Sequence, residues 1–430
     1  MNIQINNARL IDPASHSERQ QNLFIAQGRI AALGQGPAGF KPDRVLEASG
    51  LAVSPGLVDL SARLREPGFE YKATLESEMQ AAVAGGVTSL VCPPDTDPPL
   101  DEPGLVEMLK FRARSLDRAR VYPLGALTQG LEGERLTEMA ELHDAGCVAF
   151  GQPGVTISDN QVLMRSLEYA TTFGFAVWLR AQDATLSRGG VAHDGEVATR
   201  LGLAGIPVCA ETVALSSILI LARETGARIH LCRLSSAEAV EMVREARRRG
   251  LAVTSDVGVH HVHLSDLDIG YFDPNCKLIP PLRSRRDKDA LRAGLADGTI
   301  DAICSDHTPV DDDGKQVPFA QAESGATGLE LLLPLTLKWA QQAHLPLPAA
   351  LARVTTEPLR VLGLPPQRIA VGEVADLCVF DPATWWRVER GALHSQGKNT
   401  PMLGMELQGR VRYTLVGGRI VFDAPVDRQS

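Results

Sequence analysis

Short apolar segments alternate with amphipathic stretches through the middle of this chain, and this alternation constrains the fold more than any other feature. Eight segments have the pattern of buried strands: residues 57–60, 88–92, 120–124, 147–150, 176–179, 228–232, 251–254 and 301–304. Helical patterns lie between most of them, as at residues 76–84, 136–145, 213–225 and 236–249. Strand–helix alternation at this spacing is typical of a parallel sheet, and eight strands predict a (β/α)8 TIM barrel.

The main alternative is an open, doubly wound sheet, but no GxGxxG motif follows the first strand, which favours the barrel. Both ends of the chain are rich in short strand patterns. We expect these ends to pair into one small β-sandwich beside the barrel. The predicted organisation is a first part of the sandwich at residues 1–53, the barrel at 54–355, and a C-terminal helix and strands at 356–430.

Composition excludes several classes of protein. The net charge is -9 and acidic and basic residues are interspersed, so no basic face for nucleic acid is expected. No segment approaches the roughly 18 apolar residues of a membrane helix, and the first residues lack the apolar core of a signal peptide. The seven cysteines are scattered without a CxxC pair, which is typical of reduced thiols. We therefore expect a cytoplasmic protein.

A series of short motifs runs through the chain. The motifs keep their order from about residue 50 to about residue 420, and together they are far more specific than any one alone. They include Pro55-Gly56-Leu57-Val58-Asp59, Leu64-Arg65-Glu66-Pro67-Gly68, Ser305-Asp306-His307-Thr308-Pro309, Ser324-Gly325-Ala326-Thr327-Gly328 and Gly397-Lys398-Asn399-Thr400-Pro401. In these motifs and their order the chain resembles the dihydroorotases of the amidohydrolase superfamily. The resemblance implies a TIM barrel with a β-sandwich, and metal bound at the carboxyl ends of the barrel strands.

Dihydroorotases open and close a cyclic amide, and a metal pair makes hydroxide available by lowering the pKa of bound water. The resemblance implies metal ligands at five positions where this chain has other residue types: Ser61, Arg63, Gln152, Arg180 and Arg233. Asp306 remains, and in active relatives it would be the catalytic base and a metal ligand. Arg65 remains where the substrate carboxylate would bind. Asp95 and Ile279 stand where the family has asparagines.

Arginine at three of these positions argues against a metal cofactor. A guanidinium group keeps its charge at any working pH and has no lone pair to give a metal. A dication about 4 Å from one such charge would cost about 8 kcal/mol at an effective dielectric constant of about 20. We therefore expect no cofactor, no catalytic residue and a merely vestigial Asp306.

Asp306 has more than one interpretation. Since a buried carboxylate needs a partner, we expect an ion pair with Arg63, Arg180 or Arg233 in the space that metals would fill. The alternatives are a relic catalytic pair with His307, and a new mononuclear metal site with His260.

The resemblance also implies a function. Some bacteria carry an inactive dihydroorotase homologue as the non-catalytic chain of aspartate carbamoyltransferase. We therefore expect a protein that is not an enzyme but a structural subunit in pyrimidine biosynthesis. Its partner would be the aspartate carbamoyltransferase catalytic chain, in a hetero-oligomer that could contain dimers of this chain.

Two alternatives remain open. One is an active zinc-dependent dihydroorotase with an atypical site. The other is a sensor that binds an anionic metabolite at Arg63, Arg65, Arg180 and Arg233.

Overall fold

The computed structural model describes residues 1–154 and 156–424, and its centre is a barrel of eight parallel strands. The strands lie in the order β15-β14-β13-β10-β9-β8-β7-β6. They are β6 (Leu57–Asp59), β7 (Val87–Cys92), β8 (Arg120–Ala126), β9 (Ala149–Gln152), β10 (Ala176–Leu179), β13 (Arg228–Leu231), β14 (Val253–Gly258) and β15 (Ala302–Cys304). All eight overlap the segments predicted from the sequence, so the predicted TIM barrel is confirmed.

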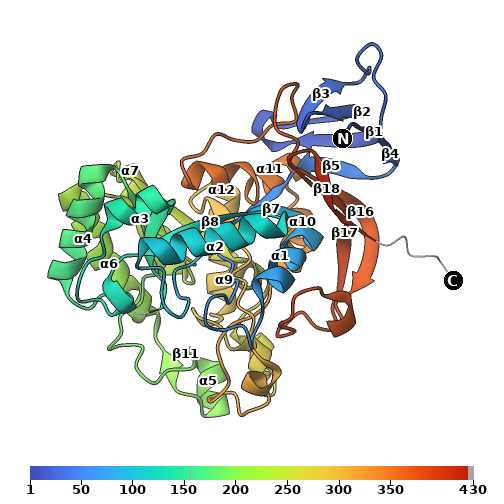
Figure 1. The fold of residues 1–430 in the computed structure, drawn as a ribbon. Coiled ribbons are helices and arrows are strands. Elements are labelled where there is room, and N and C mark those ends of the chain that lie inside the picture. Colours follow the sequence, from blue (N-terminus) through green and yellow to red (C-terminus); the bar gives the residue numbers. More distant parts are fainter. Residues whose placement is uncertain (155, 425–430) are drawn as a thin grey trace.

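Helices surround this barrel (Figure 1). They are α1 (Leu75–Ala84), α2 (Pro103–Leu116), α3 (Met139–Ala145), α4 (Asn160–Phe173), α5 (Glu196–Leu201), α6 (Val208–Thr225), α7 (Ala237–Arg248), α8 (Val259–His263), α9 (Arg285–Asp297), α10 (Leu332–Gln342), α11 (Leu347–Ala352) and α12 (Thr356–Val361). Local chemistry sets their ends. The Ser236 hydroxyl accepts a hydrogen bond from Ala239 N at the start of α7, and Gly226, with a φ of 69°, ends α6.

The barrel closes where its first and last strands end. A parallel bridge joins Ala62 to His307, just beyond β6 and β15. His307 N donates to Ser61 O at 3.0 Å, and Arg63 N donates to His307 O at 2.9 Å. These backbone bonds hold the segment of Ser61 and Arg63 against the segment of Asp306.

The two ends of the chain form a second sheet beside the barrel (Figure 1). Its strands are β1 (Ile3–Asp12), β2 (Ser17–Ala26), β3 (Arg29–Leu33), β4 (Arg44–Glu47), β5 (Ala52–Pro55), β16 (Leu377–Arg387), β17 (Glu406–Val416) and β18 (Arg419–Asp423). The two ends meet where β5 pairs antiparallel with β16, with Val53 opposite Val379. Residues 425–430, the end of the predicted C-terminal part, lie outside the described residues.

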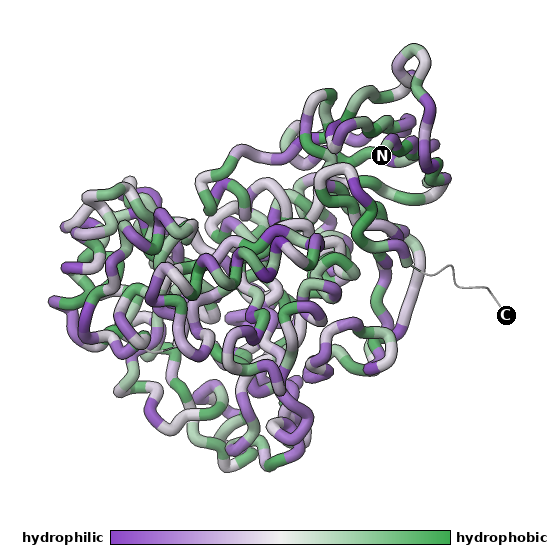
Figure 2. The backbone as a smooth tube through the Cα atoms, viewed as in Figure 1, coloured by the Kyte–Doolittle hydropathy of each residue, from purple (hydrophilic) through white to green (hydrophobic). Residues whose placement is uncertain are grey.

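The apolar residues divide into separate clusters. One fills the inside of the barrel and includes Leu60, Val91, Leu124 and Trp178. The largest lies between barrel and helices, and a third lies under the sheet of the two chain ends. Figure 2 shows the alternation of hydrophobic and hydrophilic residues that this layering requires. Across the described chain, no helix is long and apolar enough to cross a membrane.

Candidate functional site

A cavity of about 270 Å³ opens beside the carboxyl ends of the barrel strands, and we call it the mouth. Charged side chains dominate its lining. Among the described residues, the cationic ones are Arg63, Arg65, Lys72, Arg180 and Arg233, and the carboxylates are Asp95, Asp306 and Glu323. Five cations against three carboxylates leave an excess of positive charge. Ile279, the third substrate-type position predicted from the sequence, also lines the mouth.

Two of the arginines share the Asp306 carboxylate. Arg233 Nη1 lies 2.8 Å from Asp306 Oδ1, and Arg63 Nη1 lies 3.5 Å from the same oxygen. Arg63 Nε also donates to Asp95 Oδ2 at 2.7 Å. The structure therefore brings Asp306 together with two of the three arginines named from the sequence, and joins Asp95 to them in one chain of buried and partly buried ion pairs.

The pKa shifts show that these pairs favour the charged forms. Burial alone would raise the pKa of Asp95, but the charge and hydrogen bond of Arg63 outweigh it and hold that pKa below its ordinary value. Burial alone would lower the pKa of Arg233, but the neighbouring Asp306 carboxylate outweighs it and raises that pKa. Both pairs are thus ionic.

Arg65 and Arg180 differ from these, because neither has a carboxylate within ion-pair distance among the described residues. Arg65 Nε donates to Pro309 O at 2.9 Å. Arg180 donates to the carbonyl oxygens of Pro153 and Gly154 and to the Gln182 side chain. Burial, followed by the repulsion of other arginines, lowers the pKa of Arg65 to about 10 and that of Arg180 to about 9. Neither guanidinium group therefore forms an ion pair within the described part of the chain.

The implied metal positions, as the structure describes them, do not fit a metal pair. The Gln152 amide is engaged elsewhere: Oε1 accepts from Thr128 Oγ1 and Nε2 donates to Leu131 O. Arg63, Arg180 and Arg233 offer charge and N–H donors but no electron pair. Asp306 Oδ1 already accepts from Arg233. Metal chemistry at these positions is therefore not supported by the donor set.

One other group of donors could hold an ion in principle. His230, Cys232 and Asp256 place their ligand atoms within 4.8 Å of one another, the only such group found in the described part of the chain. Asp256 Oδ2 accepts from His230 Nε2 at 2.9 Å, and Asp256 Oδ1 accepts from Arg233 N at 2.7 Å. Burial raises the pKa of the Cys232 thiol, which opposes the thiolate that a metal needs. The group is better described as a buried hydrogen-bond network.

The two histidines considered as partners of Asp306 lie in other surroundings. His260 is buried, neither ring nitrogen has a hydrogen-bond partner among the described side chains and backbone, and burial lowers its pKa to about 4. His307 Nε2 instead lies 2.5 Å from Glu78 Oε2 on α1. The alternative of a catalytic Asp306–His307 pair is therefore wrong, because the His307 ring is hydrogen-bonded to Glu78 on α1 and not to Asp306.

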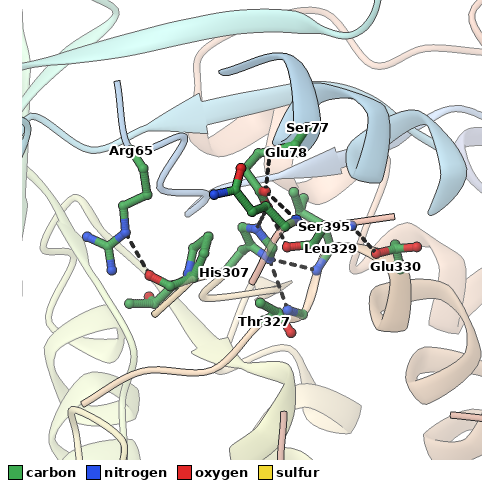
Figure 3. A network of polar contacts seen from close by, with 12 residues as sticks. Arg65, Ser77, Glu78, His307, Thr327, Leu329, Glu330 and Ser395 are labelled. Atoms are coloured by element: carbon green, nitrogen blue, oxygen red, sulfur yellow. Dashed lines mark hydrogen bonds and ion pairs between the residues drawn. The ribbon is translucent and has the colours of Figure 1, made fainter. Parts of the chain in front are cut away.

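Figure 3 shows the network around this second histidine. His307 Nδ1 accepts from Gly328 N at 3.1 Å, so the ring hydrogen lies on Nε2 and is donated to Glu78. Glu78 also accepts from Ser395 Oγ at 2.6 Å and from Ser77 Oγ at 2.8 Å. Burial alone would raise the pKa of Glu78, but these hydrogen bonds outweigh it and lower that pKa. The network ties α1, the end of β15 and the C-terminal segment together.

Three residues of the mouth have left-handed backbone conformations. The φ angles are 63° at Arg65, 56° at Arg233 and 47° at Asp306. Residues other than glycine adopt this region only at an energetic cost, and such residues cluster at functional sites. The residues with a strained backbone are therefore also charged residues of the mouth.

Several residues of the site were missed from the sequence. Lys72 and Glu323 form an ion pair across the rim, and Thr308 Oγ1 accepts from Arg63 Nη1 at 2.9 Å. Thr308 and Glu323 lie in or beside motifs that the sequence analysis quoted, which is a usable signal. Trp178 and Cys232 were assigned to strands, with no signal for a role at the site.

Comparisons with known proteins agree with this architecture. A family described as "Dihydro-orotase-like" matches residues 50–239, and one described as "Amidohydrolase family" matches residues 185–421. The chain is 47% identical over 423 residues to a "Dihydroorotase-like protein" of Pseudomonas aeruginosa, covering 98% of this chain and 100% of that one. It is 40% identical over 424 residues to a "Dihydroorotase" of Geobacter sp., covering 99% and 100%. The fold is similar to that of "L-Hydantoinase (Dihydropyrimidinase) from Arthrobacter aurescens", with a TM-score of 0.87 at 24% identity over 98% of this chain and 96% of that one.

These relatives correct one expectation. The altered ligand positions led us to expect a protein that is not an enzyme. Proteins 40% identical over almost the whole chain are named dihydroorotase, which points to an amidohydrolase enzyme instead. The physical reason is that arginine at the ligand positions opposes one kind of catalyst, a metal pair, and leaves catalysis by other groups open.

Proposed function

Because the chain belongs to the dihydroorotase-like amidohydrolases, a family of pyrimidine metabolism, we propose that its mouth binds dihydroorotate and the ring-opened N-carbamoyl-aspartate. The observation that carries the proposal is that no carboxylate of the described residues lies within ion-pair distance of Arg65 or Arg180. A ligand carboxylate would supply it. N-carbamoyl-aspartate has two carboxylates, which equals the excess of two positive charges, and dihydroorotate has one, which offsets half of it.

The shape and chemistry of the mouth support the same ligands. Guanidinium groups bind carboxylates through paired N–H donors, which fixes the orientation of a flat ligand. The volume of about 270 Å³ has room for a ligand with a small ring. The relatives named dihydroorotase act on this ligand class by name, and we propose the same reaction class here.

Calorimetric titration of the full chain with each ligand tests the proposal. We expect saturable binding that weakens at least tenfold in Arg65→Gln, because one charge-assisted contact is lost. Arg165→Gln, on the exposed face of α4, is the matched control and should leave binding unchanged. The same protein is assayed for ring opening and closing. If neither dihydroorotate nor N-carbamoyl-aspartate binds, the proposal is wrong.

We also propose the aspartate carbamoyltransferase catalytic chain as a partner. Large apolar side chains are exposed on outer helices, including Met108 and Phe111 on α2 and Val213 and Ile220 on α6, which supports a protein partner. Co-expression followed by purification through a tag on one chain tests the association. If the carbamoyltransferase assembles fully and works normally without this chain, the proposal is wrong.

A further inference from the structure

A second, smaller cavity lies next to the mouth, toward the inside of the barrel, and we call it the inner cavity. Its volume is about 20 Å³, and its lining includes Leu60, Ser61, Trp178, Arg180, Cys232 and Arg233. Leu60 and Trp178 belong to the apolar cluster inside the barrel. The volume has room for one water-sized or halide-sized species, but not for a ligand ring or a whole carboxylate group.

Two buried donors of this lining lack an acceptor. Trp178 is 2% exposed and Arg233 is 5% exposed. Within the described part of the chain, neither Trp178 Nε1 nor Arg233 Nε has a hydrogen-bond partner. Leaving such a donor unpaired costs about 1–3 kcal/mol. The lining therefore presents N–H groups that require an acceptor.

The charge of the lining selects the kind of acceptor. Arg180 and Arg233 both border the inner cavity, and none of its described lining residues is a carboxylate. Asp306, which lies outside the lining, forms an ion pair with Arg233 but not with Arg180. Burial raises the pKa of Cys232, so this thiol supplies no negative charge. A cation is repelled here, and an anion gains from two guanidinium groups in a region of low dielectric constant.

We infer that the inner cavity binds one small monovalent anion of the halide class, held by the Trp178 indole N–H and the guanidinium groups of Arg180 and Arg233. A water molecule could accept the same hydrogen bonds but would leave Arg180 without a counter-charge. The anion lies in the inner cavity and not in the mouth. Arg180 borders both cavities, so the inference is made for the chain without a ligand in the mouth. Anion binding to the folded chain alone would stabilise it by mass action.

Bromide offers a direct test, because its anomalous scattering identifies it in a crystal. Crystals of the full chain grown with sodium bromide should show one anomalous peak within hydrogen-bond distance of Trp178 Nε1 and Arg233 Nε. The same cavity with a water molecule, or no density at all, would overturn the inference. This measurement uses no substrate, so it does not depend on the function proposed for the mouth.

A solution measurement adds matched variants. The melting temperature is recorded in sodium bromide and in sodium gluconate at equal ionic strength. We expect wild-type protein to gain stability in bromide, and Trp178→Phe to bind bromide about tenfold more weakly, since one hydrogen bond to an anion is lost. Trp339→Phe is the control, because Trp339 is also buried with an unpaired Nε1 but lies on α10, away from the cavity. Equal bromide affinity in the two variants would contradict the inference.

Discussion

Arg233 and Asp306 form a buried ion pair across the carboxyl end of β14, with Nη1 and Oδ1 2.8 Å apart. Arg233 follows β13 and Asp306 follows β15, and both have positive φ angles. The backbone on each side is thus set so that the two side chains meet. This pair fills the place where the family resemblance implies cations.

Replacing Arg233 by methionine should lower the free energy of unfolding by about 3 kcal/mol, because the Asp306 charge is then left buried with Arg63 as its remaining partner. The double variant Arg233→Met/Asp306→Leu should lose less than the single variant, since both charges are removed together. Urea unfolding followed by circular dichroism measures both. A single variant as stable as wild type would show that the pair has no structural role.

The Glu78–His307 pair gives a second prediction. Glu78→Gln should cost about 3 kcal/mol of stability, because the hydrogen bonds from His307, Ser395 and Ser77 are disturbed in a buried site. Since the folded state lowers the pKa of Glu78, its stabilising effect is present above the unfolded pKa and is lost as pH falls through the folded value. The difference in free energy of unfolding between wild type and Glu78→Gln should therefore become smaller as the pH is lowered. Glu76→Gln, exposed on the same helix, should show neither effect.

Asp59 gives the opposite pH dependence. Burial raises its pKa to about 6, so the folded chain holds this proton more tightly than the unfolded chain does. The contribution of Asp59 to the free energy of unfolding is fully present below the pKa that this carboxyl has in the unfolded chain. It is lost as the pH rises from there through about 6. In Asp59→Asn, the change of unfolding free energy between pH 4 and pH 7 should lack this contribution. Asp144→Asn, at an exposed position, should keep the wild-type pH dependence of the free energy of unfolding. If Asp59→Asn also keeps that pH dependence, Asp59 is not the group responsible.

Restoring imidazole should restore metal binding at the mouth. A variant with histidine at Ser61, Arg63, Arg180 and Arg233 removes three positive charges and adds four ligands, so we expect it to bind zinc with at least micromolar affinity. The control variant carries glutamine at the three arginine positions and Ser61 unchanged; it loses the charge without gaining imidazoles. Zinc competition with a chromophoric chelator measures each. Tight binding of two equivalents by wild-type protein would contradict the argument from guanidinium charge.

The barrel was predictable because each strand has a local signal. The prediction for residues 176–179 coincides with β10, since an apolar run between two helical patterns is sufficient to define it. The prediction of a helix from residue 136 was less good, because Leu136 forms a bridge with Thr128 and α3 begins at Met139. Element boundaries depend on such contacts, which are not local in the sequence.

The site was predictable only in part. A buried carboxylate needs a partner, so arginine beside Asp306 could be expected, but the choice of Arg233 and Arg63 over Arg180 depends on where each side chain turns. The Glu78–His307 contact joins residues 229 positions apart and has no local signal. The unpaired indole of Trp178 likewise becomes visible only when the packing inside the barrel is known.

The pairing of β5 with β16 and the hydrogen bond from Ser395 to Glu78 have a consequence for synthesis on the ribosome. A nascent chain that has emerged as far as β15 contains all eight barrel strands, but the edge of β5 is still open. The Glu78 carboxylate also still lacks the hydrogen-bond donors Ser395 Oγ and Gln396 N. Completion of the native structure must therefore wait for nearly the last tenth of translation, and until then the exposed β5 edge is a place for chaperones to act.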